Sequence, residues 1–200
     1  MDVAREVTRK FKLDLLLLIP AHRPPHKARQ PIADAYHRYA MAVLASLTDG
    51  KLLVSTVELE EPDKPYTFET IERVRKAYGV GVELFFVMGA DSFLEVDTWR
   101  EPVKVLDGAN WIVVTRPGHE ITTSHLPACL QSRVMDLRGG GEPAFEQVES
   151  DRAIYLADYV NLNISSTQIR EMVADGQSIT GLVPQRVEEY VVKYGLYRRK

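Results

Sequence analysis

Short apolar runs alternate with amphipathic stretches along most of the chain. Runs of this length predict strands, which we expect at Leu15–Ile19, Leu52–Leu59, Leu84–Met88, Trp111–Thr115 and Ile154–Leu156. The first, third and fourth runs are almost continuous, which is typical of parallel strands buried on both faces.

Helical periodicity fills the intervals between these runs. Apolar residues recur at helical spacing over 36–47 and again over 68–78, and a C-terminal helix is expected over 184–194, ending before Gly195. The glycine-rich and acidic segment 138–152 has no period and predicts a surface loop. Alternation of strands and helices predicts a doubly wound α/β fold of the Rossmann-like type, with parallel strands joined by right-handed crossovers.

Composition narrows the class of protein. The 200 residues predict a single domain, 1–200, with an ordinary balance of 45% hydrophobic and 26% charged residues. A net charge of −3 argues against a general attraction to nucleic acid or to an anionic membrane. The single cysteine, Cys129, excludes an internal disulfide and favours the cytoplasm, and no apolar run approaches the roughly 20 residues of a membrane span.

The first predicted strand ends in an unusually basic stretch, "LLLLIPAHRPPHK". In open α/β sheets, ligands bind beyond the carboxyl ends of the strands. Three prolines stiffen the chain here, so His26 and Lys27, with His22 and Arg23 before them, are expected in a loop that faces a ligand. The alternative is a rigid, solvated loop whose charges are incidental.

A second candidate site begins the predicted helix in "NISSTQIREM". Ser165 and Gln168 fit a capping box, and a helix N-terminus attracts phosphate through its free amides and its dipole. Ser166 and Thr167 add two hydroxyls, and Arg170 lies one turn beyond Ser166 on the same face. The alternative is a plain N-cap followed by a solvated arginine.

Two further strands end in polar residues. "LFFVMGADSF" leads from a strand into Gly89 and Asp91, which could approach a ribose or help to hold Mg²⁺. "WIVVTRPG" ends in Arg116. Asp91 could instead cap the next helix, and Arg116 could merely begin a turn.

Taken together, these stretches resemble a known family. "IPAHRPPHK", "KPYTFET", "GADSF…TW", "VVTRPG", "ISSTQIR" and "LVPQRVEEYVVKYGLY" are similar, in order and over essentially the whole chain, to motifs of the bacterial nicotinate mononucleotide adenylyltransferases of the nucleotidyltransferase superfamily. "ISSTQIR" is shared across that superfamily, including phosphopantetheine adenylyltransferases. "PPHK", Tyr66-Thr67 and Trp99 point to the pyridine branch, although Lys64 and Pro65 depart from its usual Pro-Ser.

The resemblance implies adenylyl transfer from ATP to nicotinate mononucleotide, giving deamido-NAD and pyrophosphate, with Mg²⁺ supporting the leaving group. Catalysis would be positioning plus electrostatic stabilisation. The implied contacts to the mononucleotide are His26, Lys27, Tyr66, Thr67, Trp99 and Arg116. The implied contacts to ATP are Gly89, Asp91, Ser165, Ser166, Thr167 and Arg170. For Tyr66 and Trp99, a purely structural role in the core is the alternative.

One motif of the family is absent from the printed residues. Its members open with a strand, a glycine-rich loop and a His-x-Gly-His motif that grips the ATP phosphates, whereas "MDVAREVTRKF" resembles the remainder of the helix that follows. We therefore expect the natural protein to carry one more central strand and loop before Met1, and we assign no catalytic residue or protein-held metal site. Little adenylyl transfer is expected from the 200 residues alone.

Two other functions stay open on the sequence. One is adenylyl transfer to a different phosphate acceptor, such as phosphopantetheine. The other is a non-catalytic nucleotide-binding module. The expected partners are ATP and nicotinate mononucleotide, not nucleic acid or membrane, and a homo-oligomer is left open.

Overall fold

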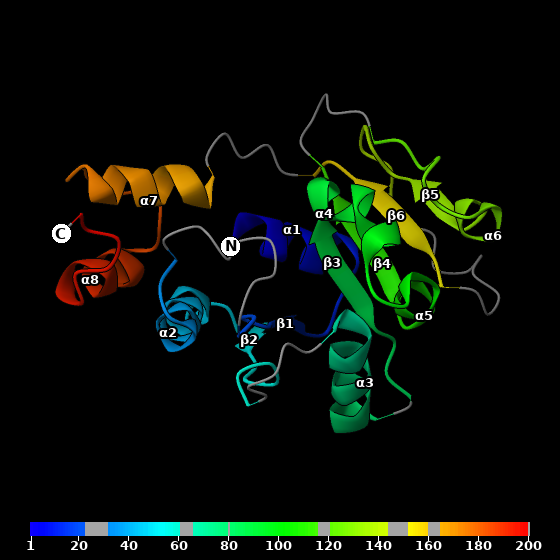
Figure 1. The fold of residues 1–200 in the computed structure, drawn as a ribbon, viewed down its shortest axis with the longest axis horizontal. Helices are drawn as coiled ribbons and strands as arrows, with labels where there is room; N and C mark the ends of the chain where they lie inside the picture. Colours follow the sequence, from blue (N-terminus) through cyan, green and yellow to red (C-terminus); the bar gives the residue numbers. More distant parts are fainter. Residues whose placement is uncertain are drawn as a thin grey trace.

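A computed structural model of the chain describes residues 1–22, 32–60, 66–79, 81–115, 121–143, 152–159 and 165–199. Helices and parallel strands alternate through these residues, as Figure 1 shows. The elements are α1 (Asp2–Lys10), β1 (Leu16–Leu18), α2 (Ala35–Ser46), β2 (Leu52–Val54), α3 (Thr67–Tyr78), β3 (Phe85–Gly89), α4 (Ala90–Leu94), the 3-10 turn η2 (Val96–Thr98), α5 (Pro102–Asp107), β4 (Asn110–Val114), α6 (Ala128–Gln131), β5 (Val134–Asp136), β6 (Ile154–Ala157), α7 (Ser166–Ala174) and α8 (Gln185–Lys193).

Every strand ladder among the described residues is parallel. β3, β4, β6 and β5 form one sheet in that order, with Phe85 opposite Asn110 and Trp111 opposite Ile154. β1 and β2 form a second, two-stranded sheet. The parallel strands with intervening helices confirm the doubly wound α/β class expected from the apolar pattern.

The four-stranded sheet has apolar packing on both faces. On one face, Val7 of α1 and Phe11 after it pack with Ile112 of β4. On the other face, residues of α3 to α6 form a second cluster that includes Trp111 and Val113. The alternation along β4 follows from the two-residue period of a strand, and it explains why this run is apolar throughout.

The two-stranded sheet belongs to a separate group of elements. Helix α2 contacts both β2 and α8, and Figure 1 shows α2, α7 and α8 together on the side of the molecule that is away from β4 and β5. Within the described ranges, β1 has a ladder partner only in β2, and β3 only in β4. The two sheets are therefore joined through loops and side-chain packing.

The largest error in the strand expectations concerns the run at 52–59. Strand β2 ends at Val54, and the carbonyl oxygen of Thr56 accepts hydrogen bonds from the amides of Leu59 at 2.7 Å and Glu60 at 3.1 Å. This local turn takes the backbone groups that a longer ladder would need. The short elements β5 and α6 were not predicted, because three or four residues show no period.

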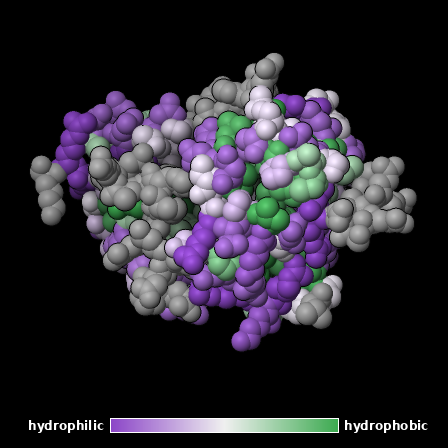
Figure 2. Space-filling model, turned by 45° about the vertical axis from the view of Figure 1, so that its right-hand side comes forward, coloured by the Kyte–Doolittle hydropathy of each residue, from purple (hydrophilic) through white to green (hydrophobic). Residues whose placement is uncertain are grey.

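The coloured part of the face in Figure 2 is mostly polar, with small apolar areas. Figure 2 shows green patches set among purple polar surface. Exposed apolar side chains include Leu94 and Val103, at 42% and 48% exposure. Among the described helices, none combines the length and the apolar character that crossing a membrane requires.

Candidate active site

The start of α7 has the capping box that the sequence predicted. The Ser165 side chain accepts a hydrogen bond from the amide of Gln168 at 3.2 Å, and the Gln168 side-chain oxygen accepts one from the amide of Ser165 at 2.7 Å. These reciprocal bonds fix the first turn. The side chains of Ser166 and Thr167 remain exposed at the positive end of the helix dipole.

Arg170 returns to this first turn from one turn further along. Its guanidinium donates to the Ser166 hydroxyl at 3.3 Å and to the Thr167 hydroxyl at 3.0 Å. The predicted alignment of Arg170 with Ser166 is therefore confirmed. Two hydroxyls, a guanidinium and the helix N-terminus thus lie within one turn, an arrangement that suits a phosphate group.

A second cluster lies at the start of α3. Tyr66 is the N-cap, Thr67 is the first helical residue, and Glu69 accepts a hydrogen bond from the Tyr66 amide at 2.8 Å. The Tyr66 ring is 42% exposed and stacks on Phe68, with ring centroids 6.0 Å apart. A partly exposed aromatic side chain beside a hydroxyl is chemically suited to a flat heterocycle.

Arg100 completes this cluster, and the sequence expectations missed it. Its guanidinium carbon lies 4.6 Å from the centre of the Tyr66 ring, and its Nη1 donates to the Tyr66 hydroxyl at 3.1 Å. The hydrogen bond to the Tyr66 hydroxyl is the main cause that raises the pKa of Arg100. The signal available in the sequence was a cation directly after Trp99, in "TWR".

Trp99 is only partly exposed. It follows η2 and packs against the cluster that contains Phe93 and Val96. Its indole Nε1 is buried and has no hydrogen-bond partner among the described residues. Buried polar atoms are normally paired, so this nitrogen is a donor available to a ligand or a water molecule.

The carboxyl ends of β3, β4 and β6 are aligned. Gly89 at the end of β3 lies opposite Val114 of β4, which in turn lies opposite Ala157 of β6. Gly89 is also the N-cap of α4, and a Cβ placed on it would meet no atom within 4 Å. Asp91 is exposed in the first turn of α4, so its suggested role as the N-cap is wrong.

Three of the predicted contacts, His26, Lys27 and Arg116, lie outside the described residues. No group of three histidine, cysteine, aspartate or glutamate side chains able to hold a metal occurs in the described part of the chain. Asp91 is the one carboxylate among the candidate ATP contacts.

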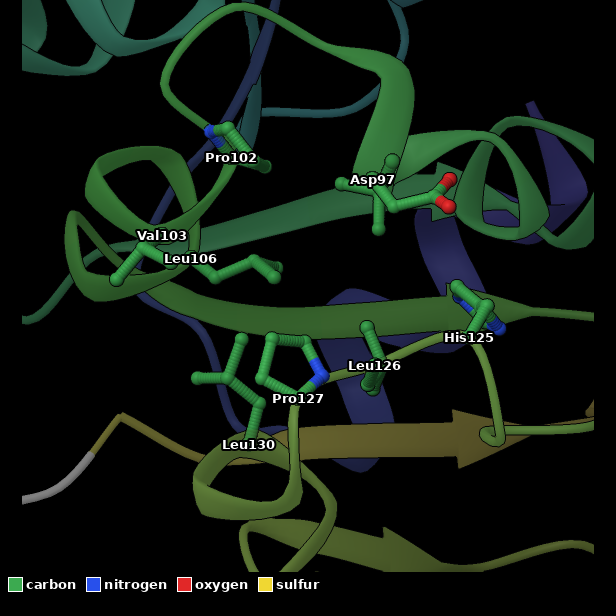
Figure 3. A pocket seen from close by; sticks show the side chains of 9 residues that line it. Asp97, Pro102, Val103, Leu106, His125, Leu126, Pro127 and Leu130 are labelled. Carbon is green, nitrogen blue, oxygen red and sulfur yellow. The ribbon is translucent and has the colours of Figure 1, made fainter.

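A hollow of about 390 Å³ lies next to η2, and none of the predicted contacts that the structure describes lines it. Most of its lining is apolar and comes from η2, α5 and the segment that leads into α6. Figure 3 shows Asp97 and His125 at one end of it. The Nε2 atom of His125 lies 3.1 Å from the carbonyl oxygen of Phe93, while its buried Nδ1 has no partner among the described residues.

Comparison with protein families identifies one match. The cytidylyltransferase-like family model matches residues 1–172. A relative from Thermoanaerobacter sp. (strain X514), named "Probable nicotinate-nucleotide adenylyltransferase", is 37% identical over 196 residues, which are 98% of this chain and 86% of the relative. A relative of the same name from Moorella thermoacetica is 36% identical over 189 residues, covering 94% of this chain and 80% of its own length.

Solved structures show the same fold. The Plasmodium falciparum nicotinic acid mononucleotide adenylyltransferase complexed with NaAD has a TM-score of 0.70 at 16% identity, covering 98% of this chain and 88% of its own. The structure of that protein with APC has a TM-score of 0.68 at 15% identity. The family model and the identity to the bacterial relatives together decide the assignment: the chain belongs to the cytidylyltransferase-like family and, within it, to the nicotinate-nucleotide adenylyltransferases.

Proposed function

We propose that this protein transfers the adenylyl group of ATP to nicotinate mononucleotide, a step of NAD biosynthesis. A 5′-phosphate oxygen of the mononucleotide forms a bond to the α-phosphorus of ATP. The bond from that phosphorus to the oxygen bridging to the β-phosphate breaks, and pyrophosphate leaves with both electrons of that bond. The product is deamido-NAD, and no covalent enzyme intermediate is needed.

The first turn of α7 is the observation that carries this proposal. The Ser165 box fixes the turn, and Arg170 lies at hydrogen-bonding distance from the hydroxyls of Ser166 and Thr167. On ATP binding, phosphate oxygens would take the place of these hydroxyls as acceptors for Arg170. The guanidinium would then neutralise charge that spreads over the phosphate oxygens as the bond to the leaving group breaks.

On the acceptor side, we propose that the exposed face of Tyr66, the Thr67 hydroxyl and the Trp99 indole surround the pyridine ring. On the ATP side, Gly89 and Asp91 would approach the ribose beyond the end of β3. His26, Lys27 and Arg116 would neutralise phosphate groups. Holding the two substrates in line would itself supply much of the rate, because the reaction then becomes effectively unimolecular.

A divalent cation accompanies this type of phosphoryl chemistry, and we propose Mg²⁺. Mg²⁺ bound to a nucleotide usually keeps several waters and takes one or two carboxylates in addition to phosphate oxygens. Exposed Asp91 fits that modest requirement, and its role would be to hold the cation near the ATP phosphates. The cation would neutralise charge on the departing pyrophosphate.

The proposal is tested with ATP, candidate acceptors and detection of both products. Calorimetry measures binding of nicotinate mononucleotide and of a non-hydrolysable ATP analogue, and a coupled assay follows pyrophosphate. We expect both nucleotides to bind. In a preparation that turns over, nicotinate mononucleotide should be the acceptor that gives deamido-NAD, with phosphopantetheine inactive. Arg170→Met should weaken binding of the ATP analogue by about tenfold, the scale of one lost charged hydrogen bond.

Arg199→Met is the matched control. Arg199 forms an ion pair with Asp175, the residue that follows the last turn of α7, at the opposite end of that helix from the proposed ATP contacts. This variant should leave the affinity unchanged. The assay is run on the 200 residues and on the product of any reading frame that continues upstream. Binding without turnover in both preparations would overturn the proposed reaction and favour a nucleotide-binding module. Ordinary turnover by the 200 residues would contradict the expectation that they transfer little of the adenylyl group on their own.

A further inference from the structure

One arginine joins the two ends of the chain segment between β1 and α2. The Nη2 atom of Arg38 donates to the carbonyl oxygen of Ala21 at 2.5 Å and to that of His22 at 3.2 Å. Its Nε donates to the carbonyl oxygen of Ala33 at 3.2 Å. A single planar guanidinium therefore connects the residues at which this segment leaves the sheet with those at which it enters α2. The fixed fork of donors on a guanidinium suits this bridging role.

The position of Arg38 is itself fixed. Asp34 caps α2 by accepting from the amide of Tyr36 at 2.9 Å, and Arg38 lies one turn into the helix. Burial is the main cause that lowers the pKa of Arg38, while the nearby charges of Asp34 and Glu58 oppose the effect. An arginine keeps its proton in such surroundings. The guanidinium is therefore a permanent charge, held in place by a capped helix.

The C-terminal tail closes over the same point. The phenol of Tyr197 is partly buried and faces the backbone amide of Ala33, with Arg38 and Arg170 as its nearby cations. Tyr197 has a φ of 65°, a left-handed conformation that costs free energy for a residue with a side chain. Such strain persists only where the surroundings impose it.

Helix α8 holds the tail in this place. The Tyr190 hydroxyl lies 2.9 Å from Nδ1 of His37 on α2, and the rings of Tyr190 and Tyr194 both lie against the His37 ring. The tail that follows is thereby directed to the base of the segment between β1 and α2, beside Arg170 of α7.

We propose that Arg38 is a positioning residue, which with Tyr197 holds the base of the segment between β1 and α2 in place. We call Arg38 and Tyr197 the clasp. This inference rests on the proposed function, because His26 and Lys27 of that segment are the proposed phosphate contacts of the mononucleotide. Fixing both ends of a binding segment in advance reduces the ordering entropy that binding would otherwise cost.

The test compares variants of the clasp with variants that lose similar bonds elsewhere. Arg38→Met, Arg38→Lys and Tyr197→Phe disrupt the clasp. Arg75→Met is the control for Arg38, because Arg75 donates to the carbonyl oxygen of Gly108 at 2.7 Å. Tyr159→Phe is the control for Tyr197, because it removes a phenol hydroxyl that donates to the carbonyl oxygen of Gly141 at 3.1 Å and takes no part in the clasp. Three quantities are measured: Tm, hydrogen exchange at the Ala33 amide, and the Kd for nicotinate mononucleotide.

Both groups of variants should lose a few degrees of Tm. Only the clasp variants should change the hydrogen exchange of the Ala33 amide and the Kd for nicotinate mononucleotide. We expect Arg38→Met to weaken mononucleotide binding by about tenfold. Arg38→Lys should be intermediate, since a lysine keeps the charge but cannot reach both ends of the segment. Tyr197→Phe should speed exchange of the Ala33 amide.

The outcomes separate this inference from the proposed function. An unchanged Kd in all clasp variants, with faster Ala33 exchange, overturns the positioning role. Unchanged exchange in Tyr197→Phe overturns the contact itself. If Arg75→Met weakens mononucleotide binding as much as Arg38→Met does, the loss of affinity comes from lower overall stability, and the positioning role is again overturned. If the parent protein binds no mononucleotide, the proposed function fails, and Ala33 exchange alone then decides whether the clasp exists.

Discussion

Arg100 and Tyr66 place a positive charge beside the aromatic surface at the start of α3. The guanidinium is exposed, yet it is oriented by the Tyr66 hydroxyl and by the ring below it. Nicotinate carries a carboxylate where nicotinamide carries a neutral amide. A cation held next to the proposed ring site would therefore favour the acid over the amide.

We expect Arg100→Met to lower kcat/KM for nicotinate mononucleotide by about tenfold relative to kcat/KM for nicotinamide mononucleotide, because only the acid gains from the cation. Lys104→Met is the matched control: Lys104 lies 4.3 Å from the centre of the neighbouring Phe68 ring. Steady-state kinetics with both mononucleotides give the ratio. If the ratio for Arg100→Met equals that of the parent, Arg100 has no part in the choice of substrate.

At this scale the sequence predicted contacts that are local along the chain. Ser165 and Gln168 are three residues apart, and Arg170 and Ser166 are four apart, so helix geometry alone brings each pair together. The meeting of Arg100 with Tyr66 spans 34 residues and depends on how η2 and α3 pack. No pattern along the chain encodes a distance of that kind.

Among the elements, the turn after β2 shows how a tertiary contact shortens a strand. Glu58 lies in this turn and accepts a hydrogen bond from the Thr70 hydroxyl of α3 at 2.8 Å. Burial is the main cause that raises the pKa of Glu58, and the Thr70 bond and the charges of Arg73 and Arg38 only partly oppose it. The apolar run through Leu59 was predicted as strand, because the spacing of apolar residues carries no information about a hydrogen bond between Glu58 and α3.

Glu58→Gln should remove a pH-dependent cost. A carboxyl whose folded pKa is raised destabilises the folded state above its ordinary pKa. This cost is absent at lower pH, grows as pH rises through the window between the ordinary and the raised pKa, and is constant above it. The variant should therefore gain stability over the parent across that window, measured by urea unfolding at several pH values. A difference that is flat with pH would contradict the raised pKa.

For the whole molecule, α1 is the element that covers the open face of the four-stranded sheet. Phe11 is 3% exposed and meets Tyr155 edge-on, with ring centroids 5.1 Å apart, and Phe85 at 5.9 Å. These contacts join the first helix to strands from the middle and the end of the sheet. The parallel α/β class could be predicted from the alternation of apolar runs with amphipathic stretches. The division into two sheets depends on which strands pair, and the apolar runs carry no information about pairing.

Phe11→Ala should destabilise the protein by about 3–5 kcal/mol, because it removes a buried aromatic ring and leaves a cavity against the sheet. Val192→Ala is the comparison, since Val192 is 57% exposed, and it should stay within about 0.5 kcal/mol of the parent. Urea unfolding followed by circular dichroism measures both. A loss below about 1 kcal/mol for Phe11→Ala would mean that α1 is not part of the cooperative core.

The contact between Tyr197 and Ala33 also bears on the order in which the protein is made. The two residues are 164 positions apart, so a ribosome adds that many residues after Ala33 before the two can meet. The strands and their covering helices can form while the tail is still being translated. The base of the segment between β1 and α2 is then completed only once Tyr197 has left the ribosome, later than the other described parts of the site.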